Sequence, residues 1–179
     1  MNRILGVAAC GLWMVSAAAA DTLNVDKTRS RIQVDGKSTG HGFTGTLQDY
    51  TVEVSGTRPQ LAPKAFKLGW KFSDLKTEDK KRDKNMIKWL GGGDPQGAFK
   101  FTRAWEKEGV KFAQGELTIH GVKKVISFPY TVKREGDWVT IDGTATLDYQ
   151  DFKLPLIRAL AVMTVDPKLA VRFHIVGRL

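Results

Sequence analysis

The sequence predicts an all-β domain in which about eight antiparallel strands, with one helical insertion, close into a barrel. Three observations predict this fold. Apolar and polar residues alternate with a period of two in many segments, turn-forming residues separate these segments, and one stretch has helical spacing instead. A chain of 179 residues fits a single domain of this kind.

The first twenty residues are typical of a cleavable export signal. A basic start at Arg3 precedes an apolar stretch over residues 4–15, and four alanines end at Ala20. The apolar stretch is too short to cross a bilayer and ends in small residues, as signal peptides do. We therefore expect a signal peptide over residues 1–20, a mature barrel domain over residues 21–179, and a periplasmic location.

A competing interpretation concerns Cys10, the only cysteine. Val7-Ala8-Ala9-Cys10 is similar to the lipobox of bacterial lipoproteins, but only residues 4–7 would precede it as an apolar core. Cleavage after Ala20 instead removes Cys10. The mature chain then has no disulfide, no thiolate and no cysteine-based zinc site, so burial of apolar surface must stabilise it.

The strand segments share one apolar face and one polar face, as antiparallel strands do. Turn residues at Gly36 and at 56–59, 108–109, 120–124 and 135–137 separate them, which predicts a meander. Changes of phase near residues 47–50 and 112–117 predict a turn or bulge at each. The alternating segments lie at residues 32–34, 66–72, 99–105, 126–132, 139–149 and 169–175.

Two stretches are expected to be helical. In residues 74–90 the apolar positions have helical spacing, acidic residues lie near the start and lysines near the end, and Gly91 begins a run of three glycines that ends the helix. A second, short helix is expected over residues 156–163, between two prolines.

No motif predicts catalysis, a metal or a cofactor. His41, His120 and His174 are far apart in sequence, and each is more simply interpreted as a hydrogen-bonding structural residue. A nucleophile elbow is absent, and the glycines from Gly91 to Gly97 lack the Lys-Ser/Thr of a phosphate loop. An enzyme is therefore the less favoured class, and we expect neither metal nor cofactor.

The formal net charge is +9, and many cations cluster over residues 76–88. Such a run is usually a solvated helix face, but it could also form a basic rim that attracts a phosphate group or an anionic membrane. Export argues against nucleic acid as the partner. The aromatic faces of the strands are also open to two interpretations, an ordinary filled core, which is the default, or the lining of an apolar cavity, which the size of the side chains favours.

Six segments carry a resemblance to a known family. The chain is similar to the YceI-like lipid/polyisoprenoid-binding proteins, which are exported bacterial domains of about this length, over essentially the whole mature region. The most specific matches are the Arg82-Asp83 pair and residues 117–122. The matching segments are VDKTRSRIQV (25–34), GHGFTGTLQDY (40–50), LKTEDKKRDKNM (75–86), PQGAFKF (95–101), GELTIHGVKKVISFPYTV (115–132) and LDYQDFKLP (147–155).

The resemblance implies a lipocalin-like barrel whose apolar channel takes an isoprenoid or another lipid chain, with the polar head near the open end. Arg82 and Asp83 match the family's helix pair, and His120 matches its turn histidine. Tyr149 stands where arginine is common, and Lys153 where glycine often stands. We expect Lys81, Arg82 and Arg158 near the head group. The expected channel lining is Phe43, Phe66, Trp70, Phe72, Met86, Trp89, Leu90, Phe99, Phe101, Leu117, Ile119, Phe128, Tyr130, Leu147, Tyr149 and Phe173.

The functional hypothesis is an exported carrier or store for an isoprenoid or fatty-acyl-type lipid, without catalysis. Transient contact with a membrane surface stays open, and so does the oligomeric state, with a homodimer as one option. The alternative hypothesis is a barrel filled by its own side chains, whose basic face docks on a protein or an anionic membrane. A hollow interior would separate the two.

Overall fold

The structure is a computed structural model that describes residues 20–58, 61–159 and 163–179. The expected signal peptide, apart from Ala20, and Cys10 lie outside the described residues. The helical elements are η1 (Phe72–Asp74), α1 (Lys80–Trp89) and η2 (Tyr149–Phe152). The strands are β1 (Asp21–Val25), β2 (Arg31–Ser38), β3 (His41–Leu47), β4 (Thr51–Thr57), β5 (Ala62–Lys71), β6 (Leu75–Lys76), β7 (Gln96–Lys107), β8 (Val110–Ile119), β9 (Val122–Glu135), β10 (Trp138–Asp148), β11 (Arg158–Ala159), β12 (Met163–Thr164) and β13 (Lys168–Arg178).

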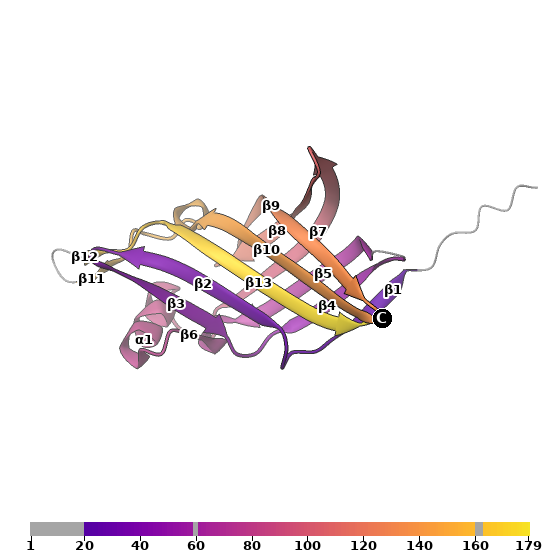
Figure 1. Cartoon of the computed structure of the whole chain (residues 1–179). Coiled ribbons are helices and arrows are strands. Elements are labelled where there is room, and N and C mark those ends of the chain that lie inside the picture. Colours follow the sequence, from indigo (N-terminus) through magenta and orange to yellow (C-terminus); the bar gives the residue numbers. More distant parts are fainter. Residues whose placement is uncertain (1–19, 59–60, 160–162) are drawn as a thin grey trace, which may run out of the picture.

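The predicted closed antiparallel barrel is confirmed (Figure 1). The ring runs β1-β4-β5-β7-β8-β9-β10-β13, and β13 returns to β1 through Asn24 and Val25. Further along β13, residues 170–174 pair with β2 instead. The segments β1 and β2 therefore act as one interrupted strand, and β4 and β3 do the same beside them.

Two-residue turns join the long strands of the meander. Glu108 and Gly109 link β7 to β8, and His120 and Gly121 link β8 to β9, all with positive φ between 52° and 77°. Two successive positive φ values are typical of the type I′ turn, whose twist matches that of paired strands. His120 is therefore a turn residue.

Of the two expected phase changes, the first is confirmed, because β3 ends at Leu47 and β4 begins at Thr51. The second is wrong, since β8 runs without interruption and the bulge lies in β7, between Phe101 and Arg103. The extra residue turns Arg103 and Trp105 to the outer face, where Trp105 stacks on Phe112 at 5.5 Å between ring centroids.

The helix expected over residues 74–90 is shorter, because α1 begins only at Lys80 and residues 72–76 form η1 and β6. Asp79 is the N-cap, and its carboxylate accepts hydrogen bonds from the first free backbone amides of α1. The second expected helix is wrong. In its place Arg158 and Ala159 pair with Met163 and Thr164 as two short antiparallel strands.

Buried apolar side chains form two clusters. The larger one lines the barrel interior and includes Phe99, Leu117 and Ile175. The smaller one packs Leu23, Val54, Leu61 and Val139 together near the β1 end of the barrel. Helix α1 and the β11–β12 pair lie at the other end (Figure 1).

Candidate functional site

The barrel encloses an apolar cavity of about 1110 Å³. This is slightly above the range of about 300 to 1000 Å³ that is usual for small-molecule sites. Every side chain expected to line the channel borders it except Tyr149, and so do Lys81, Arg82 and Arg158. The interior is hollow, so the premise of the filled-barrel hypothesis does not hold.

Glycines on neighbouring strands keep the aromatic rings against the wall. Trp70 pairs directly with Gly97 and Phe43 with Gly36. A β-carbon on Gly97 would lie 2.1 Å from the indole of Trp70, and one on Gly36 would lie 2.5 Å from the ring of Phe43. Because the glycine leaves room, the ring lies over the neighbouring backbone and the lumen stays open.

Four phenylalanines form a connected row across the cavity wall. Phe99 contacts Phe66 and Phe128 at 6.0 and 5.7 Å between ring centroids, and Phe128 contacts Phe173 at 5.4 Å. These tilted and edge-on arrangements are favourable for aromatic pairs. The row gives the cavity a continuous apolar surface that cannot hydrogen-bond to a ligand.

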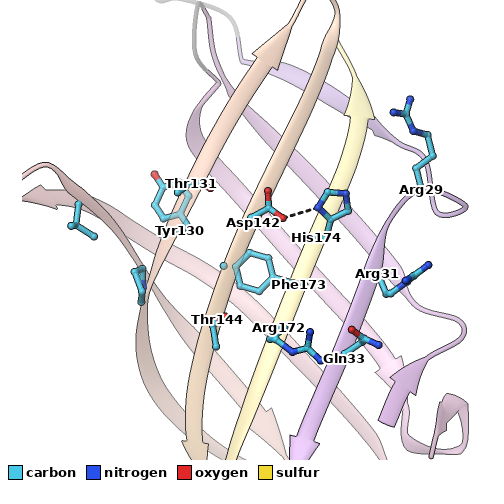
Figure 2. A pocket seen from close by; sticks show the side chains of 13 residues that line it. Arg29, Arg31, Gln33, Tyr130, Thr131, Asp142, Thr144, Arg172, Phe173 and His174 are labelled. Carbon is cyan, nitrogen blue, oxygen red and sulfur yellow. Dashed lines mark hydrogen bonds and ion pairs between the residues drawn. The ribbon is translucent and has the colours of Figure 1, made fainter. Parts of the chain in front are cut away.

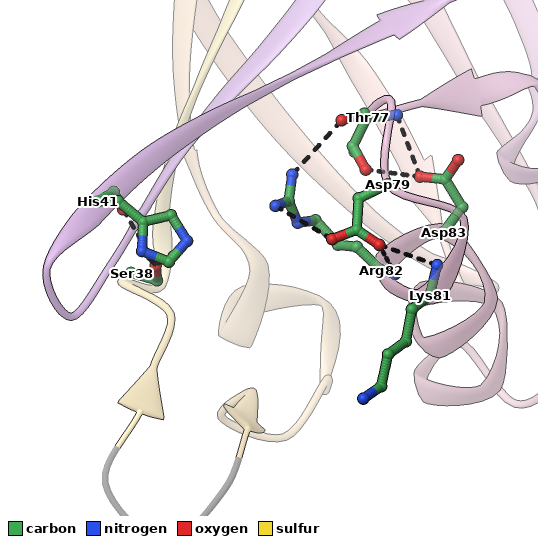
Figure 3. Close-up of polar contacts among 7 residues, drawn as sticks. All are labelled: Ser38, His41, Thr77, Asp79, Lys81, Arg82 and Asp83. Carbon is green, nitrogen blue, oxygen red and sulfur yellow. Dashed lines mark hydrogen bonds and ion pairs between the residues drawn. The ribbon is translucent and has the colours of Figure 1, made fainter.

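Most of the polar lining lies at the end of the cavity where α1 lies, which we call the mouth. Residues that border this end include Ser38, His41, Asp79, Asn85 and Thr164, together with the three cations. The Ser38 hydroxyl donates to the carbonyl oxygen of His41 at 3.0 Å, which closes the β2–β3 turn (Figure 3). The cavity is therefore amphiphilic along its length, apolar inside and polar at the mouth.

Arg82 is the best-held cation of the mouth. Its guanidinium donates to the carbonyl oxygen of Thr77 at 3.5 Å and lies 3.6 Å from the Asp79 carboxylate (Figure 3). It also covers the Phe43 ring at 4.9 Å. These contacts join α1 to β3 across the opening. The same position exposes part of the guanidinium to a ligand in the cavity.

Two aspartates organise the start of α1. The Asp79 carboxylate accepts from the backbone amides of Lys81 and Arg82 at 2.9 and 3.0 Å. The amide of Arg82 above all, helped by that of Lys81 and by nearby positive charge, holds the pKa of Asp79 below its usual value. Asp83 accepts from the amide and hydroxyl of Thr77 at 3.0 and 2.7 Å. Asp83 thus positions the loop before the helix, whereas Arg82 faces the cavity.

Tyr149 lies outside the cavity and has a structural role. It is 2% exposed, and its hydroxyl donates to the carbonyl oxygen of Val165 at 2.9 Å and accepts from the amide of Ile157 at 3.2 Å. Burial raises the pKa of this hydroxyl. The ring packs edge-on against Trp89, whose indole donates to the carbonyl oxygen of Pro155 at 2.9 Å. Tyr149 and Trp89 therefore fix the segment that borders the mouth.

The three histidines do not meet. His41 lies at the mouth, His120 in a turn, and His174 on the outer face beside Asp142. Within residues 20–58, 61–159 and 163–179 no group of histidine, cysteine or acidic residues could hold a metal ion. None of the helices in this part of the chain is long and apolar enough to span a membrane.

Comparison with known proteins adds one decisive observation. The model of the YceI-like domain matches residues 23–177. The chain belongs to the YceI-like family. The YceI-like barrel is known as a polyisoprenoid-binding fold, and this family is generally non-enzymatic. No curated protein sequence matches the chain.

Solved structures of YceI-like proteins share the fold. BcnA of Burkholderia cenocepacia superposes with a TM-score of 0.74 at 20% identity, over 86% of this chain and 99% of BcnA. The YCEI protein of Campylobacter jejuni gives a TM-score of 0.59 at 14% identity, over 99% of this chain and 94% of that protein. Both likenesses concern the fold.

Some site residues were not predicted from the sequence. Thr77 and Asp79 organise the mouth through backbone contacts, and Leu156 and Ile157 border the cavity from the segment expected to be helical. The aspartate before a run of helical spacing is a recognised N-cap signal and could have moved the start of the helix. No residue pattern signals the role of Leu156 and Ile157, because their segment is held by the Tyr149 hydroxyl at Ile157 and by the Trp89 indole at Pro155.

Proposed function

We propose that this YceI-like protein is an exported lipid carrier or store that holds the chain of an isoprenoid or another long amphiphile in the barrel. The observation that supports this proposal best is the hollow cavity with apolar walls and a polar, cationic mouth. On this proposal the protein acts in the periplasm after removal of the signal peptide and performs no chemistry on its ligand.

Removal of the lipid's hydrocarbon chain from water supplies the affinity. Burial of a CH₂ group is worth about 0.8 kcal/mol, so about fifteen buried carbons contribute roughly 12 kcal/mol before the losses of association. Apolar walls distinguish two ligands that differ by one methylene group by only about 1 to 3 kcal/mol of binding free energy. The choice of ligand therefore falls to the mouth, where Lys81, Arg82 and Arg158 favour a head group that accepts hydrogen bonds or carries negative charge.

The test is to identify what the purified protein holds. Native mass spectrometry of the untreated protein and analysis of its solvent extract should show an amphiphile with a long chain, bound one to one. The delipidated protein should then take up a polyprenol. If the untreated protein carries no lipid and the delipidated protein binds neither a polyprenol nor a fatty acid, the carrier function is wrong.

A further inference from the structure

A second hollow lies on the outer face of the barrel, outside the cavity (Figure 2). Its volume is about 750 Å³, which is within the range of about 300 to 1000 Å³ for small-molecule sites. Strands β10 and β13 form its floor. One wall comes from β9, and the other comes from β2 and Arg29, which precedes it. We call this hollow the outer depression.

The barrel wall forks at the outer depression. The ladder between β9 and β10 ends at the pair Tyr130 and Gly143. The next partner of Thr144 would be Pro129, which has no N–H to donate. Residues 144–148 still pair with β13 but have no partner in β9, which continues along β8 alone.

Two aromatic side chains border both the outer depression and the cavity at this fork. Tyr130 and Phe173 border both spaces. Gly143 between them has no side chain, and a β-carbon there would lie 2.3 Å from the ring of Phe173. Pro129 and Val110 extend the apolar surface along the β9 side, and Val110 is 44% exposed.

The rim of the outer depression carries excess positive charge. Its lining includes three arginines and one carboxylate, Asp142, whose oxygen lies 2.6 Å from Nδ1 of His174. Arg172 donates to both carboxylate oxygens of Asp35, and Arg29 covers the Trp138 ring at 4.2 Å. Within the described part of the chain, Arg31 has no hydrogen bond or ion pair, so its donors are available at the rim of the outer depression.

We propose that the outer depression is a binding site for the phosphate or carboxylate group of an anionic amphiphile. Arg31 supplies the charge-assisted hydrogen bonds, and Gln33 and Thr144 offer further donors on the rim. The hydrocarbon next to the anionic group contacts Phe173, Pro129 and Val110. The volume suits a small molecule, the depression is open to solvent, and the site does not require a ligand in the cavity.

The first experiment maps binding by NMR of the delipidated protein. Dodecyl phosphate, below its micelle concentration and in the presence of excess dodecanol, should shift the amide signals of residues 142–144 and 172–174. Dodecanol alone enters the cavity, which Phe173 also borders, so the spectrum with dodecanol is the reference against which these shifts are measured. If inorganic phosphate also shifts them, a free anion is a sufficient ligand; if only dodecyl phosphate does, the anion must belong to an amphiphile. If dodecyl phosphate leaves these amides unmoved, the proposal is wrong.

The second experiment tests whether Arg31 supplies the positive charge that binds the anionic group. Arg31→Glu should weaken binding of dodecyl phosphate at these amides about tenfold or more, because a charged hydrogen-bond donor is replaced by a like charge. Lys100→Glu, the same change on an exposed strand residue outside both spaces, should leave it within about twofold. Equal effects of the two variants, or an effect only from Lys81→Glu at the mouth, would overturn the proposal. Failure of dodecanol to enter the cavity would instead count against the carrier function.

Discussion

The indole of Trp70 lies over Gly97 of the neighbouring strand, and a β-carbon on Gly97 would be 2.1 Å from it. The contact links an ordinary strand glycine to the open interior of the barrel. A side chain at position 97 would displace the indole from the wall, and the cavity is the space into which it can move.

Gly97→Ala should therefore reduce both stability and lipid capacity. Overpacking of this kind costs about 1 to 3 kcal/mol, and the displaced indole would occupy room that the ligand needs. Thermal unfolding and the amount of bound polyprenol measure the two effects. Gly42→Ala is the matched control, since its β-carbon would meet nothing closer than 3.6 Å. Retention of full lipid capacity by Gly97→Ala would show that the ring does not define the cavity.

Trp70→Arg should abolish lipid binding, because it places a charge in the apolar wall of the cavity. Trp105→Arg makes the same change on the outer face, where Trp105 stacks on Phe112. Lipid extracted from the two purified variants gives the comparison. Only the Trp70 variant should lose its lipid while circular dichroism still shows a folded barrel. Equal loss from both variants would argue that the lipid does not depend on the cavity.

The alternation of apolar and polar residues predicted the strands, because a strand with one buried face has apolar residues at every second position. The bulge in β7 was not predictable from spacing, since Arg103 and Trp105 continue the same period as Phe99 and Phe101 while the backbone turns them outward. Pro129 within a strand pattern was a usable signal of the fork, because proline cannot continue a ladder on its N–H side.

The mouth was harder to predict. Residue types indicated cations near a head group, but the segment after Tyr149 was expected to be helical. Its actual path depends on the Tyr149 hydroxyl, which contacts Ile157 and Val165 at once. Side-chain contacts to backbone groups eight and sixteen positions away override local propensity and leave no periodic pattern.

Asp35 links the outer face of β2 to β3 and β13, and its contribution should depend on pH. The hydrogen bond from Arg172, with help from Thr44, holds the pKa of Asp35 below its ordinary value of 3.8. The stabilisation is therefore complete above the unfolded pKa and is lost as pH falls through the lower, folded one. The difference in Tm between the natural protein and Asp35→Asn should be constant near neutrality and shrink only in acid below about pH 3.8. A difference that does not change in strong acid would contradict this origin.

Tyr149→Phe removes one hydroxyl that serves two backbone groups, so its effect should exceed that of a surface hydroxyl. Loss of both hydrogen bonds in a buried place should cost about 1 to 3 kcal/mol of unfolding free energy. Tyr130→Phe is the matched control, because within the described residues the Tyr130 hydroxyl has no hydrogen-bond partner, and it should change stability by less than about 0.5 kcal/mol.

Hydrogen exchange shows whether the stability lost in Tyr149→Phe is lost only at the mouth. In Tyr149→Phe the amides of Ile157 and Val165 should exchange faster than in the natural protein, since the first loses its acceptor and the second donates to Ile157. Amides in β8 should exchange as before apart from the global change in stability. A looser segment at the mouth should also speed release of lipid from the cavity, as measured by transfer of a fluorescent fatty acid to acceptor vesicles. If release is unchanged while both amides lose protection, the ligand does not leave past this segment.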